Sequence, residues 1–137
     1  MEIFVAHGIP YAATACPSYP EDLMNKVKHA SSIKGSKFIH VLSPCPIGWG
    51  YPSEYTVKVG RLAVESSVFP LYEVYDGELY VITQMPKSIP VKDYLTIQSR
   101  FRFLKDDEIE MMQKNVDKEW ENLVSKSRRS RFTKETG

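Results

Sequence analysis

The chain alternates short, continuous apolar runs with segments in which apolar residues recur at helical spacing. The apolar runs over 9–15 and 37–42 are bounded by proline or glycine, which predicts two buried strands. Between them, Pro20 opens a helix that ends before Gly35. The residues predicted on the buried face of this helix are Leu23, Val27 and Ala30. With a further helix from Pro52, the order strand, helix, strand, helix indicates parallel pairing in an α/β sheet.

The second half of the chain has a different pattern, which predicts a hairpin followed by helices. Two strand-like runs, over 69–74 and 78–83, flank Asp76-Gly77, and Asp-Gly is a strong hairpin signal. A short helix is predicted over 91–95, and a charged helix with one apolar stripe over 105–124.

Composition and charge exclude several classes of function. The chain has 137 residues and a net charge of +1, which allows one compact core and gives no reason to expect a nucleic-acid or anionic-membrane partner. No apolar run approaches the roughly 20 residues that a membrane span needs. Residues 1–8 lack the basic segment and cleavage site of a signal peptide. The two cysteines are therefore expected to be reduced thiols in the cytoplasm.

The loop after the second predicted strand is the strongest candidate for chemistry. Cys45 lies between Pro44 and Pro46, and prolines fix φ and remove backbone N–H groups, so the loop is predicted to be stiff. A Cys-Pro pair also ends one common cysteine run that binds iron–sulfur clusters. The alternative is a buried cysteine that packs as a small hydrophobic residue. Trp49, in the turn that follows, either shields a cluster from water or packs over the edge of the sheet.

The other metal-ligand residue types have weaker patterns. Cys16 follows the first predicted strand and is interpreted as a core or strand-end thiol. The three histidines match no zinc-binding spacing. His7 is interpreted as a helix-end residue, His29 as a solvated helix residue and His40 as a residue within the sheet.

Seven segments, in a fixed order, carry a resemblance to a known family. They are residues 8–15, 19–22, 40–49, 61–65, 69–73, 91–95 and 100–104. The most informative of them contains Ser43-Pro44-Cys45-Pro46-Ile47-Gly48-Trp49. Together they resemble the C-terminal part of the β subunit of the 2-oxoacid:ferredoxin oxidoreductases, with pyruvate synthase (pyruvate:ferredoxin oxidoreductase) as the nearest type.

The resemblance implies a fold and a division of the chain. The expected fold is α/β: the C-terminal part of a thiamine-diphosphate-binding domain with a doubly wound, mostly parallel sheet, followed by a β-hairpin and a C-terminal helical arm. Residues 1–84 would belong to the thiamine-diphosphate-binding domain and residues 85–126 to the helical arm. Residues 127–137 are predicted to be a basic, disordered tail.

The resemblance also implies cofactors that this chain alone does not hold. The family's β subunit binds thiamine diphosphate and magnesium and carries a 4Fe-4S cluster. Of its four cluster cysteines, only one maps onto this chain, at Cys45. The Gly-Asp-Gly motif that places magnesium and diphosphate in the family is absent from this sequence. Its one Asp-Gly pair, Asp76-Gly77, is interpreted as a hairpin turn. No catalytic or other cofactor-binding residue is assigned, and the isolated chain is expected to be inactive and to bind none of these cofactors.

Two classes of function follow. The resemblance implies a part in the oxidative decarboxylation of a 2-oxoacid, with pyruvate expected, to acyl-CoA and CO2, with electron transfer through the cluster to ferredoxin. The implied partners are the α, γ and δ subunits, the N-terminal part of β, ferredoxin, the 2-oxoacid and coenzyme A. The alternative is a free-standing, non-enzymatic α/β module that binds a partner through its C-terminal arm.

Overall fold

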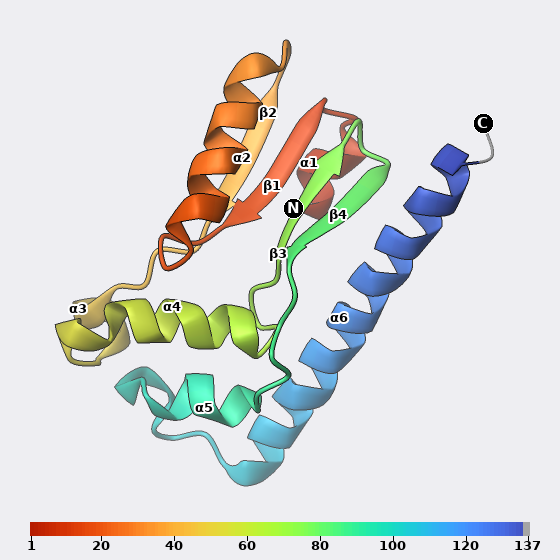
Figure 1. Cartoon of the computed structure of the whole chain (residues 1–137). Coiled ribbons are helices and arrows are strands. Elements are labelled where there is room, and N and C mark those ends of the chain that lie inside the picture. Colours follow the sequence, from red (N-terminus) through yellow and green to blue (C-terminus); the bar gives the residue numbers. More distant parts are fainter. Residues whose placement is uncertain (136–137) are drawn as a thin grey trace.

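A four-stranded sheet forms the centre of the protein, in the order β2-β1-β3-β4 (Figure 1). The computed structural model describes residues 1–135, and the side chains of residues 1–130. The strands are β1 (Tyr11–Ala15), β2 (Lys37–Val41), β3 (Leu71–Tyr75) and β4 (Leu79–Gln84). Both predicted N-terminal strands and the predicted hairpin are therefore confirmed.

The α/β class is confirmed, but the prediction of a mostly parallel sheet is wrong. Only β1 and β2 pair in parallel, whereas β3 is antiparallel to both β1 and β4. After β2 the chain does not return along the sheet. Instead, α4 (Thr56–Glu65) lies across the end of the sheet, and β3 starts from that end (Figure 1). A parallel strand would require a crossover that brings the chain back to the opposite end.

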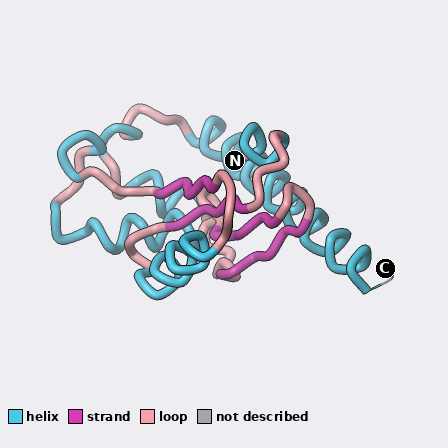
Figure 2. The backbone as a smooth tube through the Cα atoms, turned by 90° about the horizontal axis from the view of Figure 1, so that it is seen from above, coloured by secondary structure: helices cyan, strands magenta, loops and turns pink. Residues whose placement is uncertain are grey.

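Helices cover the two faces of the sheet. Alternate residues of β1 point to opposite faces, as strand geometry requires. Tyr11 and Ala13 pack with Ala30 of α2 (Pro20–Ser32), whereas Ala12 packs with residues of α1 (Glu2–Ala6) and α6 (Asp106–Glu135). The sheet thus lies between α2 on one side and α1 with α6 on the other (Figure 2).

A second apolar core lies beyond the end of the sheet. It joins α4 to α5 (Val91–Thr96) and to the first half of α6. Its buried members are Tyr51, Val59, Ala63, Val91, Tyr94 and Leu95. The amide of Val91 donates to the Gln113 side-chain oxygen at 2.8 Å, so α6 also caps the start of α5. This core supports the loop between β2 and α4, which carries Cys45, α3 (Pro46–Trp49) and the one-turn 3-10 helix η1 (Ser53–Tyr55).

Helix α6 extends beyond its predicted end. The helix continues to Glu135, where the sequence predicts a disordered tail over 127–137; residues 136–137 lie outside the described part of the chain. Ser127 is buried, and the Ser130 hydroxyl accepts a hydrogen bond from the Tyr80 amide of β4 at 3.1 Å. Contact with β4 thus stabilises a segment whose polar sequence predicts no fixed structure. No helix within residues 1–135 has the combination of length and apolarity needed to cross a bilayer.

The buried face of α2 differs from the predicted one. Lys26 and Ala30 are buried, whereas Met24 and Val27 have exposed fractions of 61% and 50%. The prediction assigned Val27 to the buried face because it treats lysine as a surface residue. The tertiary structure gives the Lys26 ammonium three hydrogen-bond partners, which turns the polar side of the helix toward the sheet.

The edge strand β2 leads to a prediction for the isolated chain. Its outer backbone edge has no partner strand within the described residues, and Val41 on it is 41% exposed. Such an edge is a template for pairing with another chain, so the isolated chain should self-associate. Val41→Lys should weaken this association severalfold, whereas Val57→Lys, at an exposed position of α4, should not. Sedimentation velocity over a concentration series measures both. A monomer at all concentrations, with a sharp reversible melt, would contradict the prediction.

Candidate functional site

Cys45 lies on a one-turn helix just after β2. It is the N-cap residue of α3, with an extended backbone (φ −113°, ψ 107°), and Pro46 occupies the first helical position. The Trp49 and Gly50 amides donate to the carbonyls of Cys45 and Pro46 at 3.0 and 2.9 Å. Pro44 is buried, whereas the Cys45 side chain is exposed. The loop therefore anchors its backbone and presents the thiol at the surface. The alternative of a buried hydrophobic cysteine is wrong for Cys45.

Two glycines permit the tight geometry of this loop. A Cβ atom at Gly48 would lie 3.5 Å from the Cys45 sulfur, so the thiol lies directly over the Gly48 backbone. Gly50 has a φ of +70°, and a Cβ atom there would overlap the Ser99 hydroxyl. The Ser99 amide also donates to the Gly50 carbonyl at 2.9 Å. The Cys45 loop is thus in close contact with η2 (Ser99–Phe101), a 3-10 turn that is distant in sequence.

Tyr51 and Trp49 link this loop to the second core. Tyr51 is buried, and its hydroxyl has no hydrogen-bond partner within the described side chains. Burial raises the pKa of Tyr51, and the nearby Thr56 side chain opposes this rise. Trp49 packs edge-on against Tyr51 and under the Arg100 guanidinium, not over the edge of the sheet.

Cys16 occupies a different environment. It is fully buried and packs with Val64 and Leu71, as predicted for a core thiol. A Cβ atom at Gly60 of α4 would lie only 3.0 Å from its sulfur, so the helix backbone covers it. The structure does not bring the two cysteines into a shared group: within the described residues, no three His, Cys, Asp or Glu side chains are arranged to hold a metal ion.

Two of the three histidines, His29 and His40, form aromatic contacts. His29 is exposed, as predicted, and it also packs edge-on against Tyr11 and Tyr75. His40 lies on β2, where it contacts Phe38 and Phe69. The position of His7 just after α1 agrees with the prediction.

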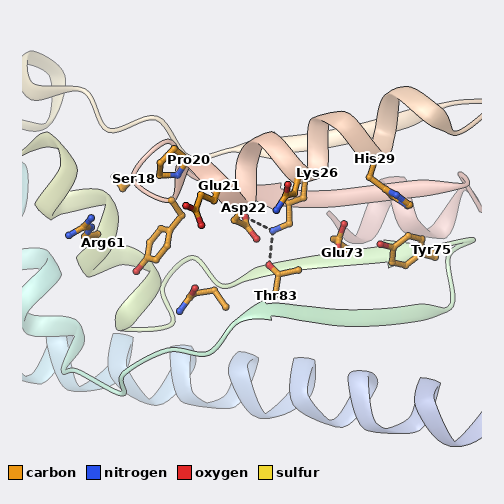
Figure 3. A pocket seen from close by; sticks show the side chains of 13 residues that line it. Ser18, Pro20, Glu21, Asp22, Lys26, His29, Arg61, Glu73, Tyr75 and Thr83 are labelled. Carbon is orange, nitrogen blue, oxygen red and sulfur yellow. Dashed lines mark hydrogen bonds and ion pairs between the residues drawn. The ribbon is translucent and has the colours of Figure 1, made fainter.

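A polar hollow with a volume of about 750 Å³ lies between α2 and the β3–β4 hairpin (Figure 3). Lys26 reaches from α2 toward Thr83 (Figure 3), with its ammonium 2.8 Å from the Thr14 carbonyl, 2.7 Å from the Asp22 carboxylate and 2.8 Å from the Thr83 hydroxyl. Burial lowers the pKa of Lys26, and the bond to Asp22 opposes that shift. All three ammonium protons have acceptors, so Lys26 acts as an internal anchor between helix and sheet.

Glu73 and Tyr75 line the sheet side of the same hollow, and the buried Tyr11 packs against Tyr75. The Tyr11 hydroxyl donates to the Glu73 carboxylate at 2.6 Å. Burial, assisted by Glu73, raises the pKa of Tyr11, and the same two causes raise the pKa of Tyr75 to about 12. Both phenols are therefore protonated at neutral pH and act as hydrogen-bond donors. Sequence analysis missed this cluster, because its members come from separate strands and a helix.

Comparison with known proteins places these features in a family. The chain is 57% identical over 115 residues to the pyruvate synthase subunit PorB of Methanocaldococcus jannaschii, a match covering 84% of the chain and 39% of that protein. It is 42% identical over 125 residues to the ketoisovalerate oxidoreductase subunit VorB of Pyrococcus abyssi, covering 90% of the chain and 40% of that protein.

The chain belongs to the PorB/VorB family of oxidoreductase subunits. A third relative, PorB of Methanothermobacter marburgensis, is 46% identical over 115 residues, or 84% of the chain and 40% of the relative. The chain spans about two-fifths of the length of these PorB and VorB proteins and matches their C-terminal part. No protein-family model matches it. The family resemblance read from the sequence is confirmed. Because PorB and VorB are named for different 2-oxoacids, membership alone does not fix the substrate.

Proposed function

We propose that this chain forms the C-terminal part of the β-type subunit of a 2-oxoacid:ferredoxin oxidoreductase and supplies Cys45 as one ligand of a 4Fe-4S cluster. The observation that carries the proposal is the match to PorB and VorB combined with an exposed thiol on a proline-flanked turn. A ligand must be a reachable thiolate held in a fixed position. Cys45 meets this requirement and Cys16, under the backbone of α4, does not.

The donor set of the chain fits one corner of such a cluster. A 4Fe-4S cluster needs four cysteine thiolates, so three must come from outside this sequence. A cluster bound there would supply one-electron transfer. The contribution of this chain is to orient Cys45 through Pro44 and Pro46 and to place Trp49 against the same loop.

Thiamine diphosphate and magnesium do not fit this chain by itself. The sequence has no Gly-Asp-Gly motif, and Asp76-Gly77 forms the β3–β4 turn, as predicted. In the proposal, these cofactors bind to the N-terminal part of the subunit, and residues 1–84 of this chain complete the thiamine-diphosphate-binding domain. The role of this chain is then structural for the thiamine site and direct only for the cluster.

The proposed reaction of the assembled enzyme is oxidative decarboxylation of a 2-oxoacid to acyl-CoA and CO2, with electrons passing to ferredoxin. Pyruvate is the proposed substrate, because the relative that is 57% identical to this chain is named as a pyruvate synthase subunit. Its partners would be the α, γ and δ subunits, the N-terminal part of β, ferredoxin and coenzyme A. The proposed location is the cytoplasm, where thiols stay reduced. The identity to PorB and VorB weighs against a free-standing interaction module.

The proposal predicts the behaviour of the isolated chain in cofactor reconstitution. Anaerobic incubation with iron and sulfide should leave less than one cluster per several chains, because one exposed thiolate cannot hold a cluster. Titration with magnesium and thiamine diphosphate, followed by calorimetry, should show no saturable binding in the micromolar range. Addition of the N-terminal part of a PorB-type subunit should restore both. Stoichiometric cluster absorption from a monomer of the isolated chain would contradict the proposal.

A further inference from the structure

Arg100 is stacked between two aromatic rings, and one of them belongs to the Cys45 loop. Its guanidinium carbon lies 4.0 Å from the centre of the Trp49 ring and 4.5 Å from that of Phe101. Trp49 is the last residue of α3, the turn that Cys45 caps. A cation at this distance over the face of an indole is attracted by the ring quadrupole, and tryptophan gives the strongest such contact.

The remaining contacts of Arg100 fix the orientation of its plane. The Nε atom donates to the side-chain oxygen of Gln98 at 3.0 Å, and an Nη atom approaches the Tyr94 hydroxyl at 3.4 Å. Gln98 is itself buried and donates to the Tyr94 carbonyl at 2.6 Å. Because Gln98 is held by α5, the guanidinium is held by the second core and not only by the loop on which it stacks.

Among the side chains that the structure describes, no ion pair includes Arg100. Arg100 and Gly48 line the same surface hollow of about 250 Å³, and Gly48 is the residue over which the Cys45 thiol lies. Arg100 thus belongs to the immediate surroundings of the thiol.

We propose that Arg100 is a positioning residue for Cys45: by clamping Trp49 against α5 and η2, it holds the turn that carries the thiol in one conformation. The effect of this clamp on a cluster rests on the proposed function of Cys45, whereas the contact between Arg100 and Trp49 is independent of that function. The clamp adds to the hydrogen bond from the Ser99 amide to the Gly50 carbonyl, which joins the same two segments. A planar, fixed-charge group suits this role, because lysine can neither stack flat nor use the same fork of donors.

The test compares Arg100→Ala and Arg100→Lys with Arg102→Ala in the assembled oxidoreductase. Arg102 is a matched control, because it is exposed and stacks only on its neighbour Phe103. The first readout is hydrogen exchange of the Trp49, Gly50 and Tyr51 amides, which bond to the Cys45 and Pro46 carbonyls. Exchange should become roughly three- to tenfold faster in Arg100→Ala, by less in Arg100→Lys, and change less than twofold in Arg102→Ala.

The second readout is the electron paramagnetic resonance spectrum of the reduced cluster, which a general loss of stability would not shift. Arg100→Ala should alter its line shape, and Arg102→Ala should not. Unchanged exchange of the loop amides in Arg100→Ala would overturn the clamp. If exchange in Arg100→Ala also rises throughout β1, that variant has lost its core, and Arg100→Lys is used in its place. Loop amides that exchange at the wild-type rate in Arg100→Lys would then overturn the proposal. A cluster that survives Cys45→Ser would instead reject the proposed function and leave the exchange result standing.

Discussion

Replacement of Lys26 by methionine should lower the free energy of unfolding by about 2–4 kcal/mol. The Lys26 side chain is 2% exposed, and its ammonium joins α2 to the β1 carbonyl of Thr14 and to Thr83 of β4. Methionine fills much of the same space, but it leaves the Asp22 carboxylate and two oxygens of the sheet without their donor. Asp22 is 15% exposed at the polar hollow, so water reaches it and the loss is smaller than for a fully buried pair.

Urea unfolding measures this effect, with the chain assembled with the N-terminal part of a PorB-type subunit to suppress self-association. Lys28→Met is the matched control, because Lys28 is exposed on the same helix and should change stability by less than about 0.5 kcal/mol. Adding Asp22→Asn to Lys26→Met should recover part of the loss, since it removes the unpaired charge. Equal losses for Lys26→Met and Lys28→Met would show that Lys26 is not an internal anchor.

Lys26 also marks the limit of prediction from the sequence. Helix α2 was predictable from Pro20 and Gly35, but the face that it buries was not. Periodicity assigns a helix face by hydrophobicity, and here a lysine with three acceptors replaces an apolar residue on that face. The acceptors come from β1, α2 and β4, and their meeting is a property of the tertiary structure alone.

Some strand pairings depend on local sequence, and others depend on contacts between distant segments. The β3–β4 hairpin was predictable because its signal, Asp76-Gly77, lies within the turn itself. The antiparallel pairing of β3 with β1 was not predictable from the sequence, because it depends on how α4 packs across the end of the sheet. Near Ser130, the helical structure of α6 is likewise supported by contact with β4, which the local polar sequence does not indicate.

The candidate site was predictable only in its local part. The prolines around Cys45 indicated a stiff loop, and the structure places the thiol on a capped turn. Arg100 was not predicted, because its contact with Trp49 in the Cys45 loop is formed by packing between distant segments. One signal was present: the alternation of arginine and phenylalanine over 100–103, which is typical of cation–π pairs.

Cys45→Ser should remove most of the 4Fe-4S cluster from the assembled oxidoreductase. A serine oxygen is a harder, more basic ligand than a thiolate and a poor substitute on iron of this kind. The proline-flanked turn fixes the position of the side chain, so no other cysteine of this chain can take its place; Cys16 lies under the backbone of α4. Activity with the 2-oxoacid should fall at least about tenfold, in line with the loss of a metal ligand.

The most direct test of the account is the iron content of Cys45→Ser and Cys16→Ala measured side by side, with low-temperature electron paramagnetic resonance of the reduced proteins. Cys16→Ala is the matched control, because alanine fits the buried, apolar environment of Cys16 without adding a polar group. The account predicts that Cys45→Ser loses the cluster signal and that Cys16→Ala keeps iron near the wild-type level. A cluster retained in Cys45→Ser and lost in Cys16→Ala would contradict the assignment of Cys45.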